Sequence, residues 1–322
     1  MLIGLRRLDA ARDAYAAALA LARRPADHDR LFGFLPRLFD AASRTAAWTA
    51  LQAAVVAAPA ATPEDAAAAE LLGLRLDLAL RRHDRFVARA ERVLAEGGGR
   101  QLADALACAV AALRDPAYPD RTRPKVFCIG LSKTGTSSVC AALERLGLAA
   151  IHWTNPLTGE LIAEQDVPLF DAFADIPVTQ VFETYWEHFP NAKFIHTVRP
   201  LEAWQASFAA HYRSAHGTGD FALLKALMAE PEAFHHGARF RTIHQDLYFR
   251  FDSLVAARAA HAARVGRFFH GRRADCLLEL NLFANQGWPQ LCAFLGRPEP
   301  AVPFPWANAA PLGGVPPDGD SP

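Results

Sequence analysis

The composition of the chain changes sharply near residue 116, and this change limits the possible folds more than any other feature. The first 115 residues are rich in Ala, Leu and Arg and poor in β-branched residues, which favours helices because Ala and Leu lose little side-chain entropy there. Apolar residues recur at helical spacing in six segments, namely 9–24, 27–42, 45–58, 63–82, 84–96 and 100–114. Residues 1–115 are therefore predicted to form a helical bundle or repeat-like region, a possible surface for a protein partner or a homodimer.

After residue 116 the pattern is different. The segment 116–124, PAYPDRTRP, contains three prolines and is predicted to be a linker. Short apolar runs then alternate with helical patterns. Strands are predicted at 126–129, 148–152, 170–174, 193–198 and 276–280, and helices at 137–146, 181–189, 201–213, 221–229, 239–269 and 286–295. This alternation predicts an α/β domain over 125–308, a P-loop-like open parallel sheet with helices on both faces, followed by a Pro- and Gly-rich tail at 309–322.

The overall composition excludes several classes of protein. Thirty-four basic and 34 acidic side chains cancel, which argues against a nucleic-acid coat or a polybasic membrane binder. Five cysteines form no CxxC pair, so they are expected to be reduced, buried thiols. The most apolar run, 46–61, contains Gln52 and is shorter than the ~20 residues of a membrane span. We expect a cytoplasmic protein that binds no nucleic acid and has no membrane span.

The segment 130–138, GLSKTGTSS, joins a predicted buried strand to a predicted helix. At such a junction the first N–H groups of the helix lack intrahelical partners and the helix dipole adds partial positive charge. Gly135 permits close approach of an anion, the hydroxyls add donors, and Lys133 adds a full charge. The segment differs from the nucleotide-triphosphatase loop GxxxxGKS or GxxxxGKT, because its lysine precedes the glycine. It predicts a phosphate-binding loop.

The loop sequence SKTGTSS resembles the 5′-phosphosulfate loop of sulfotransferases that use 3′-phosphoadenylyl sulfate (PAPS). In those enzymes an Arg at the end of a later strand and a Ser eight residues on bind the 3′-phosphate, and here Arg199 and Ser207 have that spacing. Blocks such as SKTGT, FADIP, KFIHTVRPLEAW and WPQLCAFLG are similar to a bacterial and invertebrate branch of the family. The resemblance implies that the loop residues hold the 5′-phosphate; these are Ser132, Lys133, Thr134, Gly135, Thr136 and Ser137.

The resemblance also implies a mechanism. The sulfuryl group of PAPS would pass in line to a hydroxyl of a carbohydrate, lipid or small metabolite, and PAP (adenosine 3′,5′-bisphosphate) would leave without a metal. Lys133 would stabilise the leaving phosphate oxygen. Asp175, in the block ADIP, occupies the position of the catalytic base, where other members carry His or Glu. His152, at the end of a predicted strand, is the rival base because the pKa of histidine suits neutral pH.

Some features depart from the family. Cytosolic members carry an adenine-stacking aromatic residue at the position of Ser138, so Trp288 or Phe283 is a candidate for that role. Two other functions remain possible from the residues alone. A kinase or hydrolase acting on nucleotide phosphates could use the same loop with a magnesium ligand, and a non-catalytic scaffold could sense nucleotide through it.

Overall fold

The computed structural model describes residues 2–32, 41–58, 60–96, 100–229, 237–272 and 274–307. The chain divides into two compact units. The helical unit comprises Met1–Pro119, Thr154–Leu161 and Leu227–Thr242, and the sheet unit comprises Asp120–Trp153, Ile162–Ala226 and Ile243–Pro322. The division after Pro119 falls within the segment that contains three prolines. Residues 33–40 of the predicted helix 27–42, and the predicted tail 309–322, lie outside the described residues.

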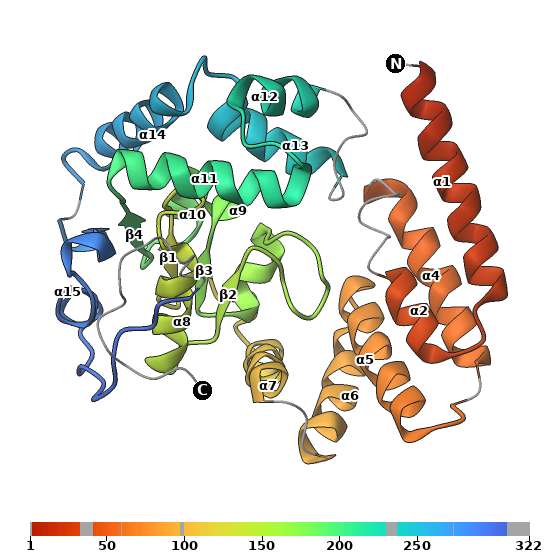
Figure 1. The fold of residues 1–322 in the computed structure, drawn as a ribbon. Helices are drawn as coiled ribbons and strands as arrows, with labels where there is room; N and C mark the ends of the chain where they lie inside the picture. The colour runs from red at the N-terminus through yellow and green to blue at the C-terminus, as the bar shows by residue number, and fades with distance from the viewer. Residues whose placement is uncertain are drawn as a thin grey trace. The chain divides into compact units, whose positions relative to one another are not determined.

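The first part of the helical unit contains the predicted helices. They are α1 (Leu2–Leu21), α2 (Pro25–Phe32), α4 (Ala41–Ala57), α5 (Pro63–Ala79), α6 (His83–Glu96) and α7 (Arg100–Arg114) (Figure 1). The start of α5 shows why the sequence breaks where it does: Pro63 occupies the first turn, and the Thr62 hydroxyl caps the helix by accepting a hydrogen bond from Asp65 N. Tyr15, Phe32 and Leu51 belong to the apolar core of these helices.

Helices α5 and α6 also share a buried ion-pair network. Asp77 is fully buried, and its carboxylate lies 3.2 Å from Nε of Arg89 and 3.6 Å from Nε of Arg85. Arg89 also pairs with Glu70. Gly73 makes room for this arrangement, because a Cβ at that position would lie 2.5 Å from Cζ of Arg89. The charges of this network are matched within the unit.

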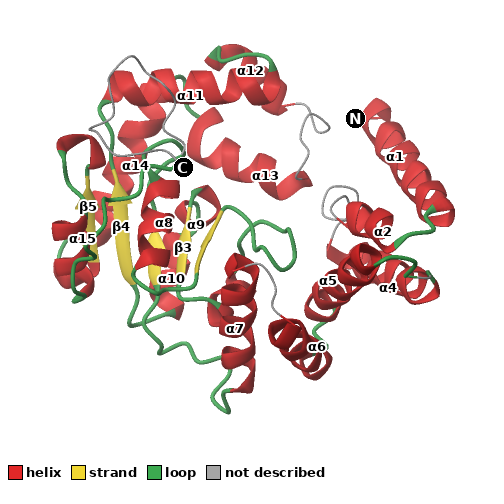
Figure 2. Ribbon diagram, turned by 60° about the horizontal axis from the view of Figure 1, so that its bottom comes forward, coloured by secondary structure: helices red, strands yellow, loops and turns green. Residues whose placement is uncertain are grey.

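The sheet unit contains five parallel strands in the order β2-β3-β1-β4-β5. They are β1 (Val126–Cys128), β2 (Ala150–His152), β3 (Ala172–Ala174), β4 (Lys193–Thr197) and β5 (Leu277–Leu280) (Figure 2). The helices of the unit are α8 (Thr136–Arg145), α9 (Ile176–Thr179), α10 (Phe182–His188), α11 (Leu201–His216), α14 (Leu254–Phe269) and α15 (Trp288–Leu295), while α12 (Phe221–Ala229) and α13 (Gly237–His244) cross the unit boundary. All five predicted strands are confirmed within two residues at each end, and so is the α/β class.

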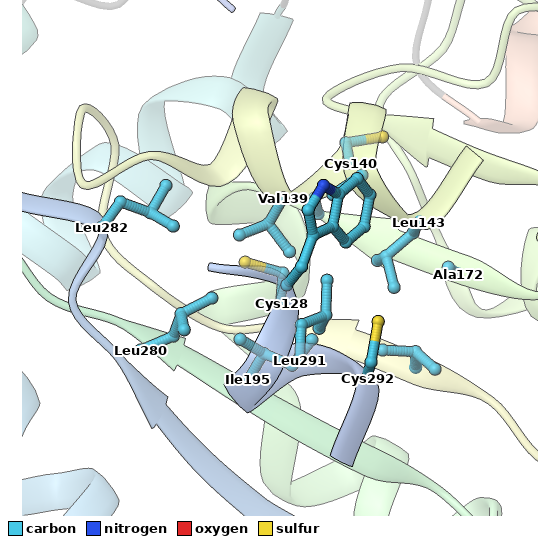
Figure 3. Packing of buried hydrophobic residues seen from close by; sticks show 14 residues of the cluster. Cys128, Val139, Cys140, Leu143, Ala172, Ile195, Leu280, Leu282, Leu291 and Cys292 are labelled. Carbon is cyan, nitrogen blue, oxygen red and sulfur yellow. The ribbon is translucent and has the colours of Figure 1, made fainter. Parts of the chain in front are cut away.

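Helices cover both faces of the sheet, as predicted. On one face, Cys128 and Ile195 of the strands pack with Leu143 of α8 and Leu291 of α15, and Figure 3 shows these residues within one apolar cluster. On the other face, the ring of Phe127 stacks on Tyr185 of α10 with a centroid distance of 4.7 Å. In β1 and β3, small or aliphatic side chains therefore face one layer of helices and a phenylalanine faces the other.

One predicted helix is wrong. The sequence predicts a continuous helix over 239–269, but the structure has α13, a π-helical turn at Gln245–Phe249, and then α14 beginning after its N-cap Ser253. The Ser253 hydroxyl accepts a hydrogen bond from Ala256 N at 3.1 Å, which starts α14 as a new helix. Four structures were not predicted: the short helix α9, and the 3₁₀ turns Glu164–Leu169, Ala274–Cys276 and Leu282–Ala284.

Candidate functional site

The carboxyl ends of the five parallel strands lie at one edge of the sheet, and the predicted site residues follow these ends. Lys133 follows β1, His152 ends β2, Asp175 follows β3 directly, and Arg199 follows β4. The register pairs His152 with Ala174, the residue before Asp175, so two side chains separated by 23 positions become neighbours (175 − 152 = 23). The topology therefore brings the predicted phosphate loop and both candidate bases together.

The loop between β1 and α8 is held in shape from within. The Thr134 hydroxyl lies 2.6 Å from both Leu131 O and the Thr197 hydroxyl, so its side chain links the loop to the end of β4. Gly130 is required at this point, since a Cβ there would lie 1.8 Å from Oγ1 of Thr197. At the other end, Gly135 has a φ of 108°, in the left-handed region, and caps α8. Threonine and glycine thus fix the loop without using its outer surface.

Two aromatic side chains anchor the same loop through Ser132, and the sequence analysis missed both. The Ser132 N–H donates to the Tyr248 hydroxyl at 2.8 Å, and the Trp204 indole N–H donates to Ser132 O at 2.9 Å. Tyr248 lies in the π-helical turn that interrupts the predicted helix, and such turns are frequent at functional sites. The contacts span 116 and 72 residues, so no local sequence signal reveals them.

The outer surface of the loop offers unused donors. Within the described residues, the N–H groups of Gly135, Thr136 and Ser137 have no hydrogen-bond acceptor, as expected at a helix N-terminus. The half-buried Lys133 ammonium likewise makes no hydrogen bond or ion pair within the described chain, and its residue has a φ of 69°. Converging N–H groups, the helix dipole and a cation are together suited to an oxyanion.

His152 and Asp175 form one polar cluster with the start of α8. The Nε2 atom of His152 lies 3.1 Å from the Thr136 hydroxyl, 3.1 Å from the Ser137 hydroxyl and 3.5 Å from Oδ2 of Asp175. The His152 side chain is 29 % exposed and that of Asp175 is 13 % exposed, so both are accessible from outside. The other oxygen of Asp175 accepts hydrogen bonds from Ile176 N at 2.9 Å and from the Ser132 hydroxyl at 3.4 Å.

Arg199 lies beside the loop and carries an unused donor. Its guanidinium donates to Lys133 O at 3.1 Å and lies over the Phe283 ring, 4.2 Å from the centroid. Its Nε atom is buried and has no hydrogen-bond partner. Burial lowers the pKa of Arg199, though the guanidinium stays charged at neutral pH. Ser207 is half-buried in α11 and makes no hydrogen bond to Arg199 within the described residues.

The two candidates for an adenine contact have different surroundings. Trp288 is buried in the core of the sheet unit and its indole N–H donates to Val302 O, so its ring is not available to a ligand. Phe283 is 41 % exposed and contacts the ring of Trp306, which is 48 % exposed, at a centroid distance of 5.9 Å. The next residue, Ala307, donates its N–H to the Ser138 hydroxyl at 3.0 Å. The sequence analysis did not single out Trp306.

A second histidine lies near the cluster of His152 and Asp175. His211 is an exposed residue of α11, and it interacts electrostatically with both Lys133 and Asp175. Partial burial lowers the pKa of His211, with Lys133 adding to that effect and Asp175 opposing it. His211 is therefore expected to be mostly neutral at neutral pH.

The described residues contain no group of three or more His, Cys, Asp or Glu side chains arranged to hold a metal ion. Among the described helices, none combines the length and the apolar character needed to cross a bilayer. Four cysteines, Cys128, Cys140, Cys276 and Cys292, are buried, and Cys108 is partly buried. Burial raises the pKa of the Cys128 thiol to about 12, so this thiol is not a nucleophile of the site. The described site therefore brings together the loop, two cations and a His–Asp pair.

Comparison with known proteins matches this part of the chain to a protein family. The sequence profile of the sulfotransferase domain matches residues 125–311, which include every site residue described above. The chain is also 25 % identical over 213 residues to the Ava biosynthesis cluster protein M of Aspergillus versicolor. That similarity covers 56 % of this chain and 79 % of the fungal protein.

Proposed function

Because the chain belongs to the sulfotransferase domain family, we propose that it transfers the sulfuryl group of PAPS to a hydroxyl of a small-molecule or glycan acceptor. One observation carries the proposal. The unpaired N–H groups of the loop and the Lys133 ammonium lie at the same sheet edge as the partnerless Nε of Arg199. Two separate groups of donors, linked by the contact of Arg199 with Lys133 O, suit a ligand with two anionic ends.

The loop would hold the 5′ end of the donor. The N–H groups of Gly135, Thr136 and Ser137, which have no acceptor within the described residues, would bind phosphate oxygens. The hydroxyls of Thr136 and Ser137, which lie 3.1 Å from Nε2 of His152, would turn to the phosphate when it binds. Lys133 has the charge and the position to stabilise the oxygen that is left on the phosphate. Arg199 would bind the 3′-phosphate through Nε, and Ser207, two turns into α11, is proposed as its second donor.

Phe283 and Trp306 are proposed to hold the adenine. Both rings are partly exposed, and Phe283 lies against the Arg199 guanidinium. Trp306 is brought toward the start of α8 by the hydrogen bond between Ser138 and Ala307. Ser138 stands where cytosolic members have their stacking aromatic residue, so the later segment would supply the ring that α8 lacks.

The bound donor supplies a sulfuryl group, whose bond to the phosphate oxygen breaks as the acceptor oxygen bonds to sulfur. We propose that Nε2 of His152 takes the acceptor proton and that Asp175 stabilises the resulting imidazolium across 3.5 Å. This reverses the order in which the sequence ranked the two bases. The reason is position: Nε2 of His152 lies beside the hydroxyls at the start of α8, whereas Oδ1 of Asp175 is engaged by Ile176 N and the Ser132 hydroxyl.

The transfer activity is tested directly with labelled PAPS and a set of hydroxyl acceptors. The expected result is acceptor-dependent release of PAP by the wild-type protein, without a requirement for magnesium. ATP turnover that requires Mg²⁺, with no PAP release, would favour the kinase or hydrolase instead. Tight PAP binding without transfer to any acceptor would favour the nucleotide-sensing scaffold.

The base assignment is tested by comparing His152→Ala with Asp175→Asn. Loss of His152 should lower kcat by about 100-fold or more, the usual scale for a general base. Loss of the Asp175 charge should lower kcat less and should shift the acidic limb of the pH–rate profile. Near wild-type turnover in His152→Ala, with loss in Asp175→Asn, would return the base to Asp175.

A further inference from the structure

Ser132 of the phosphate loop is held on both sides by aromatic side chains from distant parts of the sheet unit. Its N–H donates to the Tyr248 hydroxyl at 2.8 Å, and its carbonyl accepts from the Trp204 indole N–H at 2.9 Å. We propose that Trp204 and Tyr248 are positioning residues that act through Lys133, because they fix the backbone that places its ammonium at the leaving oxygen. This role rests on the proposed function and adds two fully buried residues to it.

Lys133 has a backbone conformation that its residue type disfavours. Its φ is 69°, in the left-handed region that favours glycine. The residue is third in a turn closed by the hydrogen bond from Thr134 N to Leu131 O at 3.2 Å, a position at which a positive φ usually calls for Gly or Asn. A lysine in this conformation must be held by its surroundings, and such residues concentrate at functional sites.

The peptide groups on either side of Lys133 are each held by a side chain. Trp204 bonds the peptide group that precedes Lys133, through Ser132 O, and Arg199 bonds the one that follows, through Lys133 O at 3.1 Å. Tyr248 holds the peptide group one step earlier in the chain, through Ser132 N. Because both flanking peptide planes are fixed, the φ and ψ angles of Lys133 are set, and with them the direction in which its side chain leaves the backbone.

The two anchors belong to one packed aromatic cluster. Phe208 contacts both of them, with its ring centroid 5.8 Å from that of Trp204 and 5.1 Å from that of Tyr248. Both hydrogen bonds to Ser132 have an N–H group as donor, so their directions follow from the chemistry of the groups. Removal of the Tyr248 hydroxyl alone should therefore release the backbone of Ser132 while the ring packing is retained.

The first measurement is the rate of PAP release by Tyr248→Phe, with PAPS and an acceptor identified in the labelled-PAPS screen. Turnover is counted per PAP-binding site, so that unfolded protein does not contribute. We expect kcat to fall by about 10- to 100-fold, because a small misplacement of a catalytic group is costly. KM for PAPS should change by less than about threefold, because the loop N–H groups and Arg199 still bind the donor. The matched control is Tyr185→Phe, which removes the hydroxyl of a buried tyrosine that stacks on Phe127 and should retain wild-type kinetics.

A double-mutant cycle separates action through Lys133 from a general effect on the fold. In the Lys133→Ala background, Tyr248→Phe should cause no further loss of turnover, because no ammonium remains to be placed. Trp204→Phe, which removes the other hydrogen bond, should behave in the same way and replaces Tyr248→Phe if that variant does not fold. Wild-type turnover in the single variants, or the same fold-loss in both backgrounds, would overturn the positioning role. Absence of PAP release by the wild type would instead overturn the proposed function.

Discussion

The ion-pair network of the helical unit and the candidate site of the sheet unit differ in how their charged side chains are matched. In the helical unit the fully buried Asp77 lies beside two arginines, and its charge is matched. In the sheet unit Asp175 is partly exposed and lies 3.5 Å from a histidine that is itself accessible. Lys133 has no ion-pair partner within the described residues, and the buried Nε of Arg199 has no acceptor. Matched charges stabilise a fold, whereas unmatched donors at a sheet edge are available to a ligand.

The contrast between the two units would fail if the charged side chains at the sheet edge were needed for the stability of the fold. The variant Lys133→Ala tests it with the largest expected effect. Because the ammonium is proposed to stabilise charge on the leaving oxygen, turnover should fall by about 10³-fold. The midpoint of thermal unfolding should remain close to that of the wild type. Lys225→Ala, which removes a partly exposed lysine of α12, is the control and should retain turnover. A large loss of stability in Lys133→Ala would contradict the assignment.

The opposite behaviour is expected for Asp77→Ala. Removal of the buried Asp77 carboxylate takes one acceptor from Arg85 and from Arg89, while Arg89 keeps its pairing with Glu70, so the cost in the free energy of unfolding should be about 1–3 kcal/mol. Denaturant titration measures this cost, and Asp13→Ala on the exposed face of α1 is the control, with an expected change of at most about 0.5 kcal/mol. PAP affinity should be unchanged in the folded protein. A variant with normal stability would show that the network contributes nothing to the fold.

A smaller effect, on the pH dependence of stability, is expected from a buried histidine of the sheet unit. His261 of α14 is buried, and its Nε2 atom lies 3.0 Å from Ile129 O. Burial lowers the pKa of His261 to about 3. Its unfolded pKa is near 6.5, so the unfolded state binds one more proton between these values. Stability from this group is present above pH 6.5 and is lost as pH falls, by about 1.4 kcal/mol per pH unit.

The measurement is the free energy of unfolding between pH 4 and 6 for the wild type and His261→Gln. The glutamine cannot titrate, so the slope of the free energy of unfolding against pH should fall by about 1.4 kcal/mol per pH unit, which corresponds to one proton. Equal slopes would mean that His261 is not held neutral in the folded protein.

The sequence predicted the parts of the molecule that depend on local patterns. The apolar run 126–129 followed by Gly130 indicated a buried strand and a loop, and the spacing of Arg199 placed a cation at the end of another strand. Parallel strands align their carboxyl ends, so the proximity of His152 and Asp175 followed from the fold.

Other parts depend on contacts that no local pattern carries. Tyr248 and Trp204 reach Ser132 across 116 and 72 residues. The π-helical turn that holds Tyr248 has the same apolar spacing as a helix, so the segment 239–269 was predicted as continuous. Trp306 was missed because its segment is placed beside α8 by long-range contacts, among them the hydrogen bonds from Ala307 N to the Ser138 hydroxyl and from Arg145 to Pro303 O.

The most direct test is calorimetric titration of the purified protein with PAP, compared with the same titration of Arg199→Ala. We expect one PAP per chain for the wild type and an affinity about 10- to 100-fold lower for the variant, because one charged hydrogen-bonding group is lost. Arg213→Ala, on the exposed face of α11, should bind as the wild type does. Absence of heat with the wild type, or equal affinity in Arg199→Ala, would contradict a bisphosphate site at this edge of the sheet.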